Sequence, residues 1–147
     1  MPNKTWKDLE RKVAKMLGGQ RIAASGNGAI KGDVQHDTYF IECKWGKQIP
    51  KTVLKWHEEL KKYPVWWLPL FEDNIANKYG CLTILKWFKK AKEQAGDKIP
   101  ILVMKPKNSR YEFVIWGYDE IGKIYAFTTL KKFAERYKKL HGMEGLK

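Results

Sequence analysis

Three residues in the first third of the chain have side-chain types and spacing suited to metal-dependent hydrolysis. Asp33 follows a glycine, and Glu42 and Lys44 come later on either side of Cys43. Carboxylate oxygens are the ligands that Mg²⁺ prefers, and binding to the ion lowers the pKa of a water molecule and neutralises phosphate charge. An amine nearby orients the attacking water or shields the transition state. The pattern therefore predicts phosphodiester hydrolysis, with Asp33 and Glu42 as metal ligands and Lys44 as the catalytic amine.

A hairpin is needed to bring these residues together. Residues 34–41 have β-branched and aromatic side chains at both ends and a polar His-Asp-Thr centre, which is typical of two strands joined by a turn. Residues two apart in a strand share a face, so we expect Glu42 and Lys44 to point together while Ile41 and Cys43 turn toward the core. Folding the hairpin back places Asp33, at its open end, near Glu42.

A third acid is predicted on the first helix. Residues 5–17 have apolar side chains spaced for one helical face, and Gly18-Gly19 ends the pattern. At about 100° per residue, Glu10 falls within the apolar sector. A carboxylate on a buried helical face must be paired, protonated or bound to metal, so Glu10 is a candidate member of the site. The alternative is a structural ion pair between Glu10 and Arg21 or a core lysine.

The order of these residues resembles a known nuclease superfamily. Glu10, Gly32-Asp33 and Glu42-Cys43-Lys44 resemble the PD-(D/E)XK nucleases, whose pattern is a helical Glu, then an Asp, then an acid-x-Lys triplet. Over residues 5–63 the chain is more narrowly similar to the archaeal-type Holliday-junction resolvases. The residues that carry this narrower similarity are Glu10-Arg11, Arg21, the Ala24-Ser25-Gly26 turn and Gly32-Asp33-Val34.

The resemblance implies a fold, a cofactor and a substrate. It implies a restriction-endonuclease-like α/β fold with a mixed central β-sheet flanked by helices, and the length of the chain indicates one nuclease domain over residues 1–147. It also implies Mg²⁺, with Mn²⁺ able to substitute, and a homodimer that nicks four-way DNA junctions symmetrically. The implied catalytic residues are Glu10, Asp33, Glu42 and Lys44, and Cys43 joins the three acids in the predicted metal site. The implied DNA contacts are Arg11, Arg21, Ser25, Lys31 and Lys47.

Composition agrees with a nucleic-acid partner. Lys and Arg number 29 against 16 Asp and Glu, giving a net charge of +13 and a pI near 9.7, values typical of a polyanion-binding protein. Two cysteines without a CxxC motif indicate neither a zinc site nor a disulfide framework. No signal peptide or membrane-length apolar run is present, so we expect a cytoplasmic protein, in a cell or an infected host. Two alternatives stay open: a PD-(D/E)XK endonuclease acting on duplex or flap DNA, and a non-catalytic basic DNA-binding module.

The remaining elements are predicted from hydrophobic periodicity. Strands are expected over residues 20–24, 99–104, 111–116 and 123–127, and helices over residues 52–63, 81–95 and 129–140. Thr52 is expected to cap the first of these helices. The aromatic segment of residues 64–79 is either core or an oligomer contact.

Overall fold

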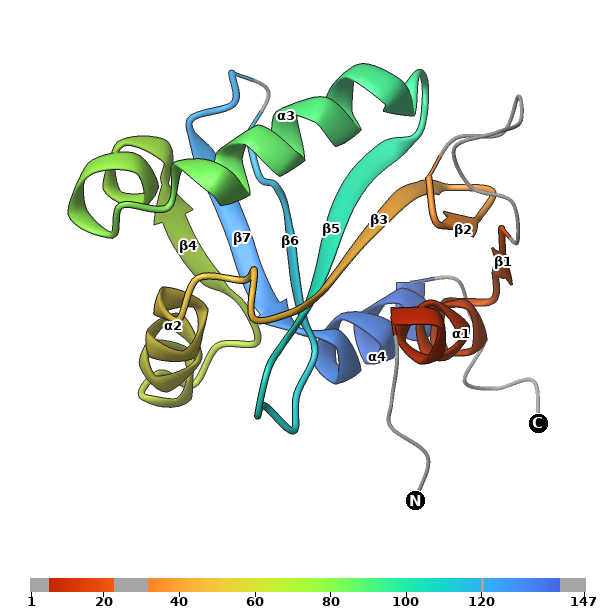
Figure 1. The fold of residues 1–147 in the computed structure, drawn as a ribbon, viewed down its shortest axis with the longest axis horizontal. Helices are drawn as coiled ribbons and strands as arrows, with labels where there is room; N and C mark the ends of the chain where they lie inside the picture. Colours follow the sequence, from red (N-terminus) through yellow and green to blue (C-terminus); the bar gives the residue numbers. More distant parts are fainter. Residues whose placement is uncertain (1–5, 23–31, 120, 141–147) are drawn as a thin grey trace.

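The chain forms a seven-stranded mixed sheet between two layers of helices (Figure 1). The computed structural model describes residues 6–22, 32–119 and 121–140. Along the sheet the strand order is β1-β2-β3-β5-β6-β7-β4. The strands are β1 (Gln20–Arg21), β2 (Val34–Gln35), β3 (Tyr39–Gly46), β4 (Leu68–Phe71), β5 (Ile99–Pro106), β6 (Phe113–Gly117) and β7 (Ile124–Thr129). The predicted α/β class is therefore confirmed.

β3 and β5 form the centre of the sheet and its one parallel pair among the described strands. They run side by side from Tyr39 against Ile99 to Gly46 against Pro106, whereas the other neighbouring strands pair antiparallel. A parallel pair needs a long crossover, and here the chain between β3 and β5 carries a helix, the edge strand β4, a short π-helical turn and a second helix. Four consecutive residues of β5, Ile101 to Met104, are fully buried, as expected for a strand covered on both faces.

The helices divide between the two faces. α1 (Trp6–Leu17) and α4 (Leu130–Leu140) cover one face, and α2 (Thr52–Lys61), η1 (Asn74–Lys78) and α3 (Leu82–Ala95) cover the other (Figure 1). Alternation along the strands assigns side chains to each layer: Ile101 and Val103 pack beneath α1 and α4, while Leu102 and Met104 pack beneath α2 and α3. Each amphipathic helix thus buries its apolar stripe against one side of a shared sheet.

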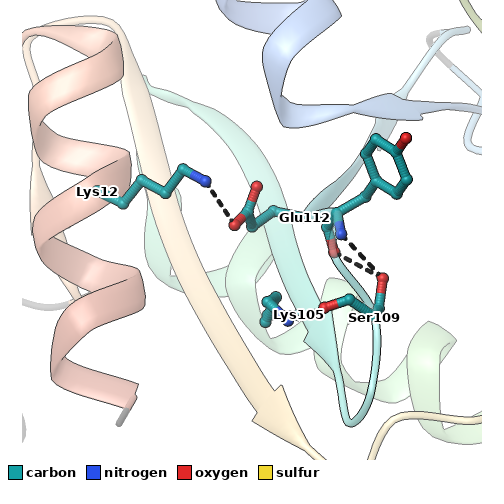
Figure 2. A network of polar contacts seen from close by, with 5 residues as sticks. Lys12, Lys105, Ser109 and Glu112 are labelled. Atoms are coloured by element: carbon teal, nitrogen blue, oxygen red, sulfur yellow. Dashed lines mark hydrogen bonds and ion pairs between the residues drawn. The ribbon is translucent and has the colours of Figure 1, made fainter. Parts of the chain in front are cut away.

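Polar contacts attach α1 to the connection between β5 and β6. Lys12 forms an ion pair with Glu112, with 2.8 Å between Nζ and Oε2 (Figure 2). The connection is itself closed by Ser109, whose hydroxyl accepts a hydrogen bond from the Tyr111 amide at 3.0 Å, and by Lys105, which donates to the Ser109 carbonyl. Lys12 is half exposed, so its ion pair is a surface contact between α1 and this connection.

Most predicted elements are confirmed with shifted ends. The first helix, the hairpin, the helices near residues 52, 81 and 129 and the strands near residues 99, 111 and 123 are all present. The predicted cap at Thr52 is wrong: Lys51 is the N-cap, Thr52 is the first helical residue, and no side chain caps the helix. The amides of Val53 and Leu54 instead donate to the carbonyls of Pro50 and Lys51.

The segment of residues 64–79 belongs mainly to the fold. β4 lies at the edge of the sheet with Leu68 opposite Phe127, and Leu70 and Ile75 are buried in the core beneath α2 and α3. The two tryptophans before β4 are only half-buried. In the part of the chain that the structure describes, no helix is long and apolar enough to cross a membrane.

Candidate functional site

The β2–β3 hairpin places Asp33 against β3, as predicted. The Asp33 amide donates to the Ile41 carbonyl at 3.0 Å, and the Asp33 carboxylate accepts a hydrogen bond from the Cys43 amide at 2.8 Å. The turn is held by His36, whose Nδ1 accepts from the Thr38 and Tyr39 amides, so Nε2 carries the proton and donates to the Leu17 carbonyl at 2.8 Å. The role of His36 is therefore structural, and it fixes the hairpin to the end of α1.

Glu10 points inward from α1, as predicted from its position on the helix. Its side chain is only 4% exposed, and its Oε1 accepts a hydrogen bond from Arg21 Nε at 2.7 Å. Arg21 comes from β1, and its guanidinium also lies 5.5 Å from the centre of the Trp6 ring. The ion pair that the sequence left as an alternative for Glu10 is thus present in the structure.

That ion pair does not remove Glu10 from the acid cluster. The Glu10 and Asp33 carboxyl groups share a side-chain hydrogen bond, which raises the pKa of Glu10 and lowers that of Asp33. The charge states of the two carboxyl groups therefore depend on each other. Burial is the largest influence on both groups and leaves both pKa values above the ordinary range.

Glu42 and Lys44 share one face of β3, as predicted. Glu42 Oε2 lies 4.0 Å from Lys44 Nζ, and both side chains are about one quarter exposed. Burial, and then the charge of Asp33, raise the pKa of Glu42 to about 7, against the opposing effect of Lys44 and Lys90. The Lys44 ammonium is held over the Trp87 ring at 5.2 Å from its centre. Glu42 therefore changes its charge near neutral pH, in the field of Asp33 and Glu10.

Cys43 contributes its backbone amide, rather than its thiol, to the site. Its amide is the donor to Asp33, while its thiol packs against the apolar cluster beneath α1 and α4. Burial and the charges of Asp33, Glu10 and Glu42 raise the pKa of the Cys43 thiol well above its ordinary value. A thiol must be deprotonated to bind a metal, so the thiol is less suited to this role than the three carboxyl groups.

The acid cluster fits a hard divalent cation through its carboxylates. In residues 6–22, 32–119 and 121–140, no group of three or more His, Cys, Asp or Glu side chains is placed to hold a metal ion together. Mg²⁺ is commonly held by one or two carboxylates, with water and substrate oxygens completing its shell. Asp33 and Glu42, which are coupled through charge, are the candidate pair, whereas Glu10 is linked to Asp33 and Arg21 and is not placed with them as a third ligand. Burial is the main cause of the raised pKa values of all three acids, and the charge of Asp33 adds to it at Glu42; a bound cation would favour the charged carboxylates.

The predicted DNA contacts divide into three groups. Arg21 is occupied by Glu10, whereas Arg11 is exposed on the outer side of α1 and pairs with Asp8 at 3.1 Å. Lys47 is exposed just after β3, beside a cavity of about 340 Å³ that Trp45 and Lys107 also line. Ser25 and Lys31 lie outside the described residues. The structure therefore brings Arg21 into the acid cluster and leaves Arg11 and Lys47 on the surface.

Sequence reasoning missed two residues of this site, Trp87 and Lys90. Both lie on α3, three residues apart and hence on adjoining positions of one helical face. α3 packs across β3 and β5, which carries these side chains over Glu42 and Lys44. The helical pattern of residues 81–95 identifies the face, but the partner strand follows only from the parallel pairing of β3 and β5.

Comparisons with known proteins add no family to this picture. No family model matches the chain, and neither a curated protein nor a solved structure matches it.

Proposed function

We propose that this protein is a metal-dependent endonuclease of the PD-(D/E)XK type with a restriction-endonuclease-like fold. The observation that carries the proposal is the meeting of Glu10, Asp33, Glu42 and Lys44 in one electrostatically coupled cluster. Glu10 and Asp33 share a hydrogen bond, the Asp33 charge raises the pKa of Glu42, and Lys44 lies 4.0 Å from Glu42. These residues come from α1, the start of the hairpin and β3, so the fold rather than local sequence unites them.

Each residue has a defined part in phosphodiester hydrolysis. Asp33 and Glu42 would hold Mg²⁺, which supplies an activated water and neutralises charge on the phosphate oxygens. The Cys43 amide and the buried Arg21 fix the orientations of Asp33 and Glu10 respectively. The Lys44 ammonium, held over Trp87, donates to the attacking water or to the phosphate as negative charge grows in the transition state.

DNA is the proposed substrate because the protein is strongly basic. The chain carries 13 more basic than acidic side chains, and a polyanion gains affinity from such a field. The resemblance to archaeal-type resolvases makes the four-way junction the first candidate substrate. A two-fold homodimer would match the two equivalent strands of a junction, so dimerisation forms part of the proposal.

The test offers purified protein three labelled DNA substrates in separate reactions. A four-way junction, a linear duplex and a flap are each incubated with Mg²⁺, with Mn²⁺ or with chelator, and the products are resolved on a denaturing gel. Symmetric nicking of the junction alone supports a resolvase, and cutting of duplex or flap supports a general PD-(D/E)XK endonuclease.

A matched control separates the acid cluster from general effects of charge. Glu42→Gln is compared with Glu58→Gln, the same substitution at an exposed position of α2. We expect Glu58→Gln to cut as the wild type does and Glu42→Gln to be inactive. Binding without cutting by the wild type in either metal would replace this proposal with a non-catalytic basic DNA-binding module.

A further inference from the structure

A groove of stacked aromatic rings lies on the face of the sheet covered by α4. It has a volume of about 280 Å³, close to the lower limit of about 300 Å³ for small-molecule sites. Its main walls are the rings of Tyr39, Trp66, Trp67, Trp116 and Tyr118, and Arg136 of α4 stands at its side. Glu42 and Lys44 project from the other face of β3 and take no part in it.

Two nearly parallel ring pairs form the floor of this aromatic groove. Trp66 stacks on Trp116 with 16° between the ring planes, and Trp67 stacks on Tyr118 with 27° between theirs. Residues 63–67 form bends rather than a strand, which lets the adjacent side chains of Trp66 and Trp67 contact one ring on β6 and one just after its end. In the core beneath α2 and α3 both arrangements occur: Trp56 lies edge-to-face with Phe127, whereas Phe113 stacks on Phe127 with 20° between the ring planes.

Contacts within the fold hold the rings of the groove in place. The hydroxyl of Thr128, a fully buried residue, donates a hydrogen bond to the Trp66 carbonyl and so fixes the backbone that carries the stacked rings. Trp116 also packs against Phe133, with 5.1 Å between the ring centres. Rings held in place lose little conformational freedom on binding, which favours their use as a recognition surface.

The charge of the side chains around the groove determines which flat ligands it can bind. The Arg136 guanidinium lies 5.2 Å from the centre of the Trp66 ring, and none of the described residues lining the groove is acidic. Arg136 disfavours a cationic ligand, so the groove is unsuited to the alkylammonium groups that other aromatic cages hold. A flat group linked to an anion meets both features, because rings stack on its faces and the guanidinium pairs with its charge.

We infer that the aromatic groove binds unpaired bases of single-stranded DNA, with Arg136 contacting the adjoining phosphate. This inference rests on the proposed function for the identity of the polymer as DNA. Tyr39 precedes Glu42 by three residues on β3, which corresponds to about 10 Å along an extended strand. Because the groove and Glu42 lie on opposite faces of the sheet, a strand that occupied both would have to pass around the sheet.

The test measures binding to an eight-nucleotide oligothymidine by fluorescence anisotropy, in chelator and at fixed salt, so that cleavage plays no part. We expect Trp66→Leu to weaken binding about five- to a hundredfold, the range for one base stacked on an aromatic ring. Tyr63→Leu is the matched control, because Tyr63 is an exposed aromatic in the same segment outside the groove, and it should bind as the wild type does. Arg136→Ala, a surface change with little effect on folding, should weaken binding and reduce its salt dependence.

The outcomes separate this inference from the nuclease proposal. Wild-type affinity in a folded Trp66→Leu protein and in Arg136→Ala would overturn the groove assignment, even if the enzyme cuts DNA. So would a wild-type dimer that dissociates in Trp66→Leu without any change in oligothymidine binding, because the groove would then be an interface between copies. Loss of oligothymidine binding in both variants supports the groove, whether or not the acid cluster proves catalytic.

Discussion

The Arg21 guanidinium donates to the buried carboxyl group of Glu10 at 2.7 Å, and the same carboxyl group is hydrogen-bonded to Asp33. Glu10 thus links a structural ion pair to the proposed metal ligands. The positive charge of Arg21 partly compensates the negative charge of the buried Glu10 carboxylate. Arg21 therefore lowers the pKa of Glu10, against the larger effect of burial, which raises it.

Arg21→Ala is predicted to destabilise the protein through this ion pair. Removing one partner of a buried pair commonly costs about 3–5 kcal/mol, and roughly 2–4 kcal/mol is expected here because Arg21 remains 19% exposed. The double variant Glu10→Gln with Arg21→Ala should regain much of this loss, since no charge is left unpaired. Urea unfolding in chelator measures both. Equal stability of the single and double variants would contradict the interpretation.

Asp33→Asn and Glu42→Gln are predicted to abolish cleavage while leaving DNA affinity within a few fold. In Asp33→Asn, the amide oxygen of the new side chain can still accept from the Cys43 amide, so the hairpin geometry is kept while a negative ligand is lost. Gel-based cleavage and binding in chelator provide the two measurements. Robust turnover by either variant would show that the acids do not hold the catalytic ion.

Local periodicity predicted the acid cluster well, because each of its acids depends on a short-range rule. The helical repeat placed Glu10 inward, and the two-residue repeat of a strand placed Glu42 beside Lys44. The hairpin then needed only one turn to bring Asp33 to β3.

What the sequence did not predict depends on contacts between distant segments. Trp87 and Lys90 reach Lys44 and Glu42 because β5 pairs parallel to β3, a choice that no local pattern encodes. The stacking of Trp66 on Trp116 likewise requires β4 to add to the edge of the sheet beside β7. The predicted Thr52 cap failed because backbone carbonyls already accept the first helical amides.

The raised pKa of Glu42 predicts that stability without metal falls as pH rises. The folded value of about 7 lies above the ordinary value of 4.5, so the folded chain retains a proton that the unfolded chain loses. This contribution is complete below about pH 4.5 and disappears as the pH passes 7; at about 1.36 kcal/mol per pH unit it amounts to about 3 kcal/mol. Glu10 and Asp33 are shifted in the same direction.

Urea unfolding in chelator at pH 5, 6.5 and 8 checks this pH dependence. Glu42→Gln should flatten the decline by up to about 3 kcal/mol, while Glu58→Gln should follow the wild type. Saturating Mg²⁺ favours the charged carboxylates and should restore stability at pH 8. Parallel wild-type and Glu42→Gln curves would show that Glu42 has an ordinary pKa in the folded protein.

Gly32 is predicted to be required for the position of Asp33. Its φ is +90°, and an added Cβ would lie 3.2 Å from both the Ile41 carbonyl oxygen and the Phe40 ring. Gly18 is a matched control, because its φ is +77° but a Cβ there meets nothing within 4 Å. The left-handed backbone alone costs a non-glycine residue about 1–2 kcal/mol, so Gly18→Ala should lose about that much stability and keep full cleavage. Gly32→Ala should lose more and also cut more slowly, because the contact displaces Asp33 from the Cys43 amide; equal cleavage by the two variants would contradict this dependence.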